Sequence, residues 1–463
     1  MSTAADSSAD AGSSRGRRSI EPIFRSSGIR IEPGIAICQT DLPLDWYQEE
    51  FKSYAEEYLA LPDRTPESVL PWMDRYLEPA RKELGPKLLL LAHYYMGGEI
   101  VKLVERYGGR VADSYELALQ ARSNSGAEFI VESAVHFMAD AIASLAHPHQ
   151  QVFITNPRAG CTLEMYAKEH HVAPAVDELR ARYGDDLLVV AYMNTSGRVK
   201  AIAGETGGAV CTSGNAKAVM TWALKQGKKI LFVPDKHLGE AACWWCGIPK
   251  EQQFQWGGGE EGARQKIGAM KPAERDQLDR SRVILWGSYC GVHTIFRPAM
   301  VDYWRARGFT VHVHPESPLD VVQAADGAGS TKYLWQVVAD AKPGAKLAIA
   351  TEGHFVRNAR ALGKAKGVEV VHLADIPDPS FQSIGCGCAT MSRNDPPHLV
   401  ALIDLLRKGR APDANRVEAG DLVDEISGSR ERLSPQERAT VVAHARRALE
   451  RMVEITEAAR RGT

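Results

Sequence analysis

The sequence has little charge of one sign and no long hydrophobic run. Its 463 residues include 56 Lys and Arg against 58 Asp and Glu, for a net charge of −2, so it lacks the basic excess of most nucleic-acid-binding proteins. The longest strongly apolar runs, such as 88–92 and 187–191, have the length of a strand. A bilayer crossing needs ~20 apolar residues. We therefore expect neither a nucleic-acid partner nor a membrane span.

Cysteine is also scarce, at eight residues in the chain. Because no apolar signal-peptide stretch precedes them, we expect a cytoplasmic protein without a disulfide scaffold. Thiols kept in a reducing compartment are usually buried, catalytic or bound to a metal. The positions are Cys38, Cys161, Cys211, Cys243, Cys246, Cys290, Cys386 and Cys388.

Changes in composition divide the chain into five segments. The first 20 residues are rich in Ser, Ala and Gly, which is typical of a disordered leader. Aromatic and leucine residues at helical spacing between residues 44 and 84 predict a helical cap. We expect the leader and cap at 1–84, α/β units at 85–185, 186–308 and 309–410, a loop-like insertion within the second unit at 241–280, and a helical tail at 411–463.

A threefold repeat is the main signal in the sequence. From about residue 85, short apolar runs alternate with helical stretches, which indicates an α/β fold with mainly parallel sheets. In each unit a strand ends at a polar residue, a hydroxyl follows near a helix start, and a cysteine closes the unit. The triplets are His93, Ser114 and Cys161; Asn194, Ser213 and Cys290; and Glu316, Thr331 and Cys388. The separations from polar residue to hydroxyl, 21, 19 and 15 residues, predict a triplicated unit.

The repeat also predicts where these residues meet. Parallel α/β sheets place functional residues at the carboxyl ends of their strands. If the units pack around a pseudo-threefold axis with those ends facing inward, one thiol, one hydroxyl and one polar group from each unit converge. The alternative is that three α/β units contain such residues by chance.

Three cysteines from distant units would leave one position of a tetrahedral metal open. Sulfur ligands suit zinc or an iron–sulfur cluster, and an iron without a protein ligand can act as a Lewis acid. Each cysteine taken alone is also compatible with core packing. Spacing does not decide between Cys386 and Cys388 as the ligand. Cys243 and Cys246 form a CxxC, for which a redox pair, a metal contact and two buried thiols all stay open.

Two further patterns point to acid–base chemistry and anion binding. The proline of VHVHPES predicts the end of a strand, which leaves His314 and Glu316 at a loop mouth as a general acid and base, or as a surface pair. GAGSTK at 327–332 places backbone amides and hydroxyls at an expected helix start, which suits phosphate or carboxylate. The positions of Ser114 and Ser213 are analogous, so we expect three anion-binding helix starts.

Jointly, the motifs make the chain resemble the quinolinate synthase family over about residues 88–394. They are AHYY at 92–95, DS at 113–114, FMAD at 137–140, AGC at 159–161, YMNTSGRVKA at 192–201, TSGNA at 212–216, PDKHLG at 234–239, WGSYCGVH at 286–293, HPESP at 314–318, GST at 329–331, TEGH at 351–354 and CATMSRN at 388–394. The resemblance implies three similar αβα sandwich units around a central site. It also implies condensation of iminoaspartate with dihydroxyacetone phosphate to quinolinate, phosphate and two waters, with a [4Fe–4S] cluster as cofactor.

The resemblance assigns roles to individual residues. The cluster ligands it implies are Cys161, Cys290 and Cys388, the last because the family's CxxMxxN pattern begins there. Tyr95 matches an acid/base residue, and we expect it to move protons together with His314 and Glu316. The implied substrate-binding residues are His93, Ser114, Tyr192, Asn194, Ser213, His314, Glu316 and Thr331.

Rival interpretations remain open. One is a different iron–sulfur or zinc lyase acting on a phosphorylated or dicarboxylic substrate. Another is a non-catalytic sensor of redox state or iron that uses the CWWC and GCGC thiols as switches. If the family reaction holds, we expect functional coupling to an aspartate oxidase or dehydrogenase that supplies iminoaspartate. The sequence leaves open whether iminoaspartate passes directly from that partner. The 241–280 segment, the tail and Met96, where many relatives have glutamine, depart from the family pattern.

Overall fold

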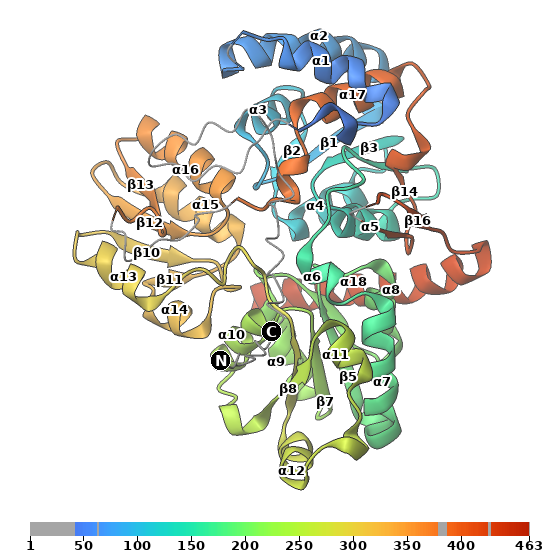
Figure 1. The fold of residues 1–463 in the computed structure, drawn as a ribbon, viewed down its shortest axis with the longest axis vertical. Helices are drawn as coiled ribbons and strands as arrows, with labels where there is room; N and C mark the ends of the chain where they lie inside the picture. Colours follow the sequence, from blue (N-terminus) through green and yellow to red (C-terminus); the bar gives the residue numbers. More distant parts are fainter. Residues whose placement is uncertain (1–41, 63, 378–386, 425–426, 463) are drawn as a thin grey trace, which may run out of the picture.

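Three mainly parallel sheets, each flanked by helices, form the framework of the protein (Figure 1). The structure is a computed structural model, and it describes residues 42–62, 64–377, 387–424 and 427–462. The expected leader at residues 1–20 and Cys386 lie outside these residues.

Each sheet draws its strands from one repeat of the sequence. The first contains β1 (Leu88–His93), β2 (Arg110–Ala112), β3 (Phe129–Ser133), β4 (Gln151–Ile154) and, from the tail, β14 (Arg416–Val417). The second contains β5 (Leu187–Tyr192), β6 (Ala209–Cys211), β7 (Lys229–Val233), β8 (Gln253–Gly257) and β9 (Val283–Gly287). The third contains β10 (Thr310–Val313), β11 (Gly327–Ala328), β12 (Lys346–Ala350) and β13 (Glu369–His372). A separate two-stranded sheet pairs β15 (Leu422–Val423) with β16 (Arg430–Glu431).

The three sheets share one strand order. In each, the first strand of the unit pairs in parallel with the second on one side and with the third on the other, and the last strand of the unit pairs with the third. The second unit has an additional strand, β8, which lies outside β9 at the edge of its sheet. Every residue of β1 and β5 is buried, which explains why these strands are apolar throughout and do not alternate. The predicted α/β class with repeated parallel sheets is confirmed. The pseudo-threefold axis itself stays a prediction.

Helices connect the strands and cover the sheets. They are α3 (Gly98–Arg106), α4 (Ser114–Ser123), α5 (His136–Leu145), α6 (Thr162–Met165) and α7 (Glu169–Tyr183) in the first unit; α8 (Gly197–Glu205), α9 (Ala216–Lys225), α10 (Lys236–Trp245), α11 (Gly259–Arg264) and α12 (Pro272–Arg280) in the second; and α13 (Pro298–Arg305), α14 (Leu319–Ala324), α15 (Thr331–Asp340) and α16 (Gly353–Ala365) in the third. Among the described residues, no helix combines the length and apolar character that a bilayer crossing requires.

The predicted helical cap is present at the top of Figure 1. Helices α1 (Lys52–Leu59) and α2 (Pro66–Leu84) pack on α17 (Pro396–Arg407). The Tyr54 hydroxyl donates to Asp404 Oδ2 at 2.6 Å, so a polar contact joins α1 to α17 beside the apolar packing.

The tail forms the long helix α18 (Pro435–Arg461), which crosses from the first unit to the second (Figure 1). Ser434 and Glu437 form a capping box at its start. Gly204 of α8 permits the close packing, because a Cβ atom there would lie 2.0 Å from the carbonyl oxygen of His444. Near the other end of α18, Thr456 Oγ1 accepts a hydrogen bond from Asn215 Nδ2 at 2.8 Å.

Segment 241–280 is more regular than the loop-like reading expected. It contains β8, α11 and α12, and β8 pairs in parallel with β9 at the edge of the second sheet. Phe254 and Trp256 are the buried positions of the alternating pattern in β8. Three glycines at 257–259 directly follow these residues, and such a run is typical of a loop, so the short strand has no clear signal in the sequence.

Candidate active site

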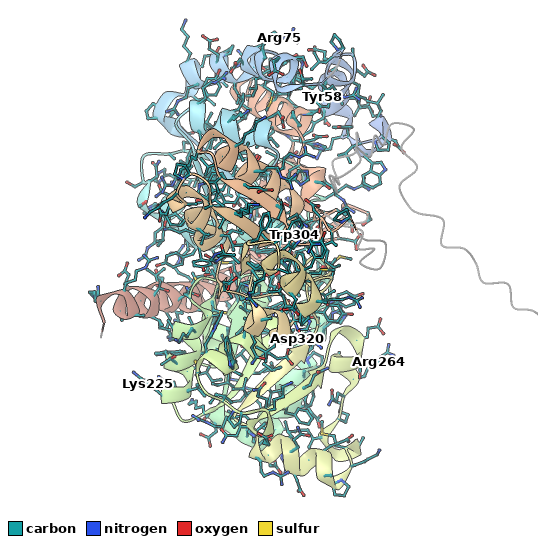
Figure 2. All side chains as sticks on the ribbon, turned by 90° about the vertical axis from the view of Figure 1, so that its left-hand side faces the viewer. Tyr58, Arg75, Lys225, Arg264, Trp304 and Asp320 are labelled. Carbon is teal, nitrogen blue, oxygen red and sulfur yellow. The ribbon has the colours of Figure 1, made fainter. Side chains whose placement is uncertain are left out.

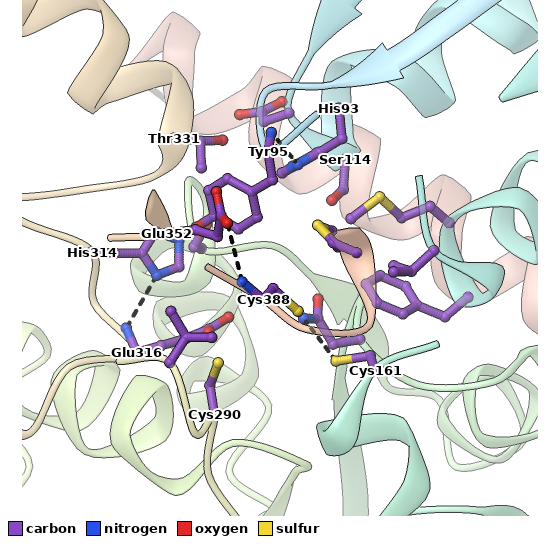
Figure 3. A pocket seen from close by; sticks show the side chains of 18 of the residues that line it. His93, Tyr95, Ser114, Cys161, Cys290, His314, Glu316, Thr331, Glu352 and Cys388 are labelled. Atoms are coloured by element: carbon purple, nitrogen blue, oxygen red, sulfur yellow. Dashed lines mark hydrogen bonds between the residues drawn. The ribbon is translucent and has the colours of Figure 1, made fainter. Parts of the chain in front are cut away.

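All twelve residues that the sequence assigned to cluster, catalytic or substrate-binding roles line one cavity of about 630 Å³, a volume that includes space open to solvent (Figure 3). They are His93, Tyr95, Ser114, Cys161, Tyr192, Asn194, Ser213, Cys290, His314, Glu316, Thr331 and Cys388. The structure therefore brings together residues from all three units. Their individual roles stay predictions.

The shared strand order explains this convergence. The polar groups end or follow the first strand of each unit, the hydroxyls follow the second, and the cysteines follow the last. Because the strands are parallel, these segments leave the sheets at their carboxyl edges, where α/β proteins place ligand sites. The end of β10 at Val313 confirms that the strand stops before His314 and Glu316. His312 instead points to Tyr333, with 2.9 Å between its Nδ1 and the phenol oxygen.

Three thiols stand close together on the cavity wall. Desolvation raises the pKa of Cys161 and of Cys290 well above the usual value for a thiol, and the charges of nearby cysteines and of Glu316 raise both further. Cys290 Sγ lies 3.3 Å from His293 Nδ1, and Cys388 Sγ lies 3.2 Å from Thr390 Oγ1. Mutually repelling thiolates in such a place need a positive partner, which is what a metal centre supplies.

Glu316 is the most strongly held carboxylate in the cavity. Its Oε2 lies 2.9 Å from His293 Nδ1, and its Oε1 accepts a hydrogen bond from the Tyr192 hydroxyl at 2.5 Å. Burial by itself would raise the pKa of Glu316, but the charge of His293 and these hydrogen bonds outweigh burial and hold that pKa far below its usual range. Glu316 is therefore a carboxylate at neutral pH.

His93, His314 and Tyr95 are held in their neutral forms. Burial lowers the pKa of His93 to about 4 and, together with the charge of His293, lowers the pKa of His314 to about 3. Burial and then the charge of Glu316 raise the pKa of Tyr95 well above its usual value. Tyr95 is therefore a neutral phenol at neutral pH, and its hydroxyl lies 2.7 Å from Thr351 Oγ1. It can donate a proton, and the nearby carboxylate of Glu316 can accept one.

The three hydroxyls lie at or near the starts of three helices. Ser114 begins α4, Thr331 begins α15, and Ser213 lies three residues before α9. The residues beside them are in mutual contact: Ser330 Oγ donates to Asp113 Oδ2 at 3.4 Å. Backbone N–H groups and hydroxyls at helix starts are suited to binding an anion.

Two buried carboxylates that sequence reasoning did not assign hold the cysteine segments. Asp235 Oδ2 accepts the backbone N–H of Cys290 at 3.0 Å. Glu352 Oε1 accepts the backbone N–H of Cys388 at 3.0 Å (Figure 3). Both residues are helix N-caps, of α10 and α16. Their motifs, PDKHLG and TEGH, were visible in the sequence, but the contacts with the cysteines depend on the tertiary fold. His293 was missed for the same reason.

Comparison with known proteins decides the family. Residues 77–454 match the family model described as "Quinolinate synthetase A protein". The quinolinate synthase of Staphylococcus carnosus is 33% identical over 370 residues, covering 80% of this chain and 93% of the relative. That of Corynebacterium glutamicum is 34% identical over 411 residues, covering 88% of this chain and 93% of the relative.

The chain belongs to the quinolinate synthase family. The predicted resemblance is thereby confirmed, and so is the expectation of an enzyme. Members of the quinolinate synthase family are enzymes of NAD biosynthesis, so a non-catalytic sensor is disfavoured.

The donor set of this quinolinate synthase family member fits a metal centre. Cys290 Sγ, a ring nitrogen of His293 and a carboxylate oxygen of Glu316 lie within 4.8 Å of one another. The thiols of Cys161 and Cys388 line the same cavity. His293 and Glu316 also pair with each other, with 2.9 Å between His293 Nδ1 and Glu316 Oε2. Sulfur donors suit zinc or an iron–sulfur cluster.

The CxxC does not join this site. Cys243 is a buried residue of α10, and burial raises the pKa of its thiol. Cys246 Sγ lies 3.4 Å from Thr221 Oγ1. Neither residue lines the active-site cavity of the quinolinate synthase fold.

Proposed function

We propose that the protein is a quinolinate synthase that condenses iminoaspartate with dihydroxyacetone phosphate to give quinolinate, phosphate and two waters. The observation that carries the proposal is one cavity lined by Cys161, Cys290 and Cys388, by the acid–base pair Tyr95 and Glu316, and by hydroxyls from three helix starts. Each group in this set matches a need of the reaction: a Lewis acid, proton transfer and an anion site.

Cys161, Cys290 and Cys388 would hold a [4Fe–4S] cluster. When bound, such a cluster supplies one iron without a protein ligand, which can polarise an oxygen of the substrate. Asp235 and Glu352 would fix the backbone of two of the ligands through their hydrogen bonds to the amides of Cys290 and Cys388.

Glu316 and Tyr95 would carry the protons of isomerisation and dehydration. Glu316 is the base, because the charge of His293 and the hydrogen bonds from His293 and Tyr192 keep it ionised within a buried site. Tyr95 is the acid, because its phenol stays protonated until a base accepts the proton. Neutral His314, stacked on His293 with ring centroids 4.6 Å apart, can bind the substrate without adding charge.

The hydroxyls of Ser114, Ser213 and Thr331 would hold the anionic groups of the substrates. They come from three different units, so a phosphate or carboxylate bridging them is oriented relative to the thiols on the opposite units. Tyr192, Asn194 and His93 line the same cavity and would complete the contacts.

Two measurements on protein purified without oxygen test the proposal. About four iron and four sulfide per chain are expected from a four-iron cluster, with quinolinate formed from iminoaspartate and dihydroxyacetone phosphate. Zinc without sulfide in folded protein would overturn the cluster and favour a zinc lyase. A full cluster with no quinolinate would favour another iron–sulfur lyase, which product analysis with other phosphorylated or dicarboxylic substrates would identify.

Three further expectations stay predictions. They are the division at residues 84, 185, 308 and 410, the cytoplasmic location, and functional coupling to an aspartate oxidase or dehydrogenase that supplies iminoaspartate.

A further inference from the structure

A second cavity adjoins the active site on the side of α18. It encloses about 720 Å³ and shares Asp113 and Thr212 with the active-site cavity. Gly214 and Ser330, which also line it, directly follow Ser213 and precede Thr331. The second cavity therefore begins immediately behind the three hydroxyls.

A narrow ring separates the two spaces. Ser330 Oγ donates to Asp113 Oδ2 at 3.4 Å, and a Cβ atom on Gly214 would lie 3.2 Å from the same Ser330 oxygen. Thr212 is the fourth residue of the ring, since it lines both cavities. Its backbone N–H donates to Asn215 Oδ1 at 2.6 Å, which holds it in place. Side chains of this size can part by rotamer changes, so the ring is a constriction and not a wall of packed core.

Two cations, Lys332 and Arg460, line the outer space, and the one acid among its lining residues, Asp113, lies at the ring. Lys332 is half exposed, and its Nζ lies 3.4 Å from Glu116 Oε2. The exposed Arg460 lies over the ring of Tyr115, 5.4 Å from its centroid. An adjoining groove that shares Asn215, Thr456 and Arg460 adds Lys217, Lys225 and Arg451 against one acid, Glu454. Figure 2 places Lys225 on the flank where α18 lies.

We propose that this outer cavity is the entrance through which phosphorylated and dicarboxylic anions reach the active site, and that Lys332 and Arg460 bind them on the way. This inference rests on the proposed function, whose substrates are anions. A concave space lined by charges of one sign raises the local concentration of oppositely charged ligands. The cations end at the ring, beyond which lie the three hydroxyls.

Helix α18 builds the entrance in two ways. It contributes Arg460 to the lining of the cavity. Its Thr456 also accepts a hydrogen bond from the side chain of Asn215, and Asn215 accepts the backbone N–H of Thr212 in the turn that contains Ser213. The family model match ends at residue 454, so both side chains lie beyond it.

Steady-state kinetics with the cluster-loaded protein test the entrance. For Lys332→Gln/Arg460→Gln, the KM for dihydroxyacetone phosphate at ~0.01 M salt should rise about fivefold with kcat unchanged. Raising the salt to ~0.5 M should raise the wild-type KM toward that of the variant, since charges are then screened over a few ångströms. Arg447→Gln is the matched control, because Arg447 is exposed on α18 and lines neither cavity. A variant KM equal to wild type at low salt would overturn the proposal.

A second readout does not depend on turnover. The full-length chain prepared without cluster is treated with an anionic methanethiosulfonate and with its cationic analogue, and modification of Cys161, Cys290 and Cys388 is followed by mass spectrometry. The anionic reagent should react several-fold faster with these thiols, and the preference should vanish in Lys332→Gln/Arg460→Gln but not in Arg447→Gln. Equal rates for the two reagents in wild type would refute the entrance. A charge preference in a protein that forms no quinolinate would leave the entrance standing and reject the proposed reaction.

Discussion

Glu352 and Cys388 are joined by a hydrogen bond of 3.0 Å, from the backbone N–H of the cysteine to Oε1 of the carboxylate. The same carboxylate accepts from the Phe355 backbone through Oε2 at 3.0 Å and pairs with His354. A buried side chain at the start of α16 thus fixes a thiol that lies 36 residues further along the chain. The pairing of Asp235 with Cys290 repeats this arrangement in the second unit.

The first prediction concerns this anchoring. An amide has one acceptor oxygen, so Glu352→Gln cannot accept from both Cys388 and Phe355. We expect cluster affinity to fall about tenfold, a usual effect of losing a group that orients a metal ligand. Iron retained per chain after a timed chelator challenge measures it. Glu369→Gln, on the exposed start of β13, is the control and should retain iron like wild type.

The second prediction concerns the ligands themselves. Cys161→Ser, Cys290→Ser and Cys388→Ser should each lose the visible absorption of the cluster, because each removes one of three sulfur donors. Cys386→Ser and Cys246→Ser should keep it. Cys246 does not line the cavity. Cys386 lies outside the described residues, so the prediction for it rests on the sequence motif alone. Loss of absorption in Cys386→Ser with retention in Cys388→Ser would reverse the choice between the two.

The third prediction concerns proton transfer. Tyr95→Phe removes the donated proton and Glu316→Gln removes the accepting charge, so we expect kcat to fall about 100-fold or more in each, with iron content unchanged. Tyr183→Phe controls for loss of a phenol, since that hydroxyl bonds Asp279 on the surface. Near wild-type turnover in both variants with an intact cluster would remove them from the mechanism.

The fourth prediction concerns the contact between α8 and α18. Gly204→Ala places a Cβ atom against the backbone of His444, which cannot move as a flexible side chain would. We expect a loss of about 2 kcal/mol in the free energy of unfolding, with faster proteolysis of α18. Gly268→Ala has open space around the new methyl group and should stay within about 0.5 kcal/mol of wild type. Equal stability of the two variants would show that α18 is loosely held.

The fifth prediction concerns a buried acid away from the active site. Burial raises the pKa of Glu132 from 4.5 to about 8, and neither carboxyl oxygen has a hydrogen-bond partner. The folded state thus keeps a proton that the unfolded state releases above its lower pKa, so stability is lost as pH rises from about 5 to 8. Glu132→Gln should remove this part of the pH dependence, gaining about 3 kcal/mol relative to wild type between pH 5 and 8. Denaturant unfolding at both pH values measures it, and parallel curves would contradict the raised pKa.

Sequence reasoning succeeded where a residue's place follows from local pattern. His93 and Tyr192 end apolar runs that can only be buried parallel strands, so their position at a carboxyl edge was predictable. The shared order of the strands then brought the three cysteines together. The two-residue strand β11 (Gly327–Ala328) exists through its pairing with β10, and no local signal marks it.

What was missed depends on contacts between units. His293 stands three residues after Cys290, and nothing near it in the sequence reveals that its ring meets Glu316 of the third unit. Asp235 and Glu352 could be predicted as helix caps, but their second partners depend on the path of the chain after the last strand of the unit. Docking geometry of this kind is not encoded in spacing or composition.

The separation of the three thiols along the chain has a consequence for biogenesis. Cys161, Cys290 and Cys388 are 129 and 98 residues apart, and each follows the last strand of a different α/β unit. While the chain is still emerging from the ribosome, with two sheets formed, it offers at most two of the three sulfurs. A cofactor held by all three thiols could therefore load only after the last sheet docks, and its content in a preparation would then count the molecules that have finished folding.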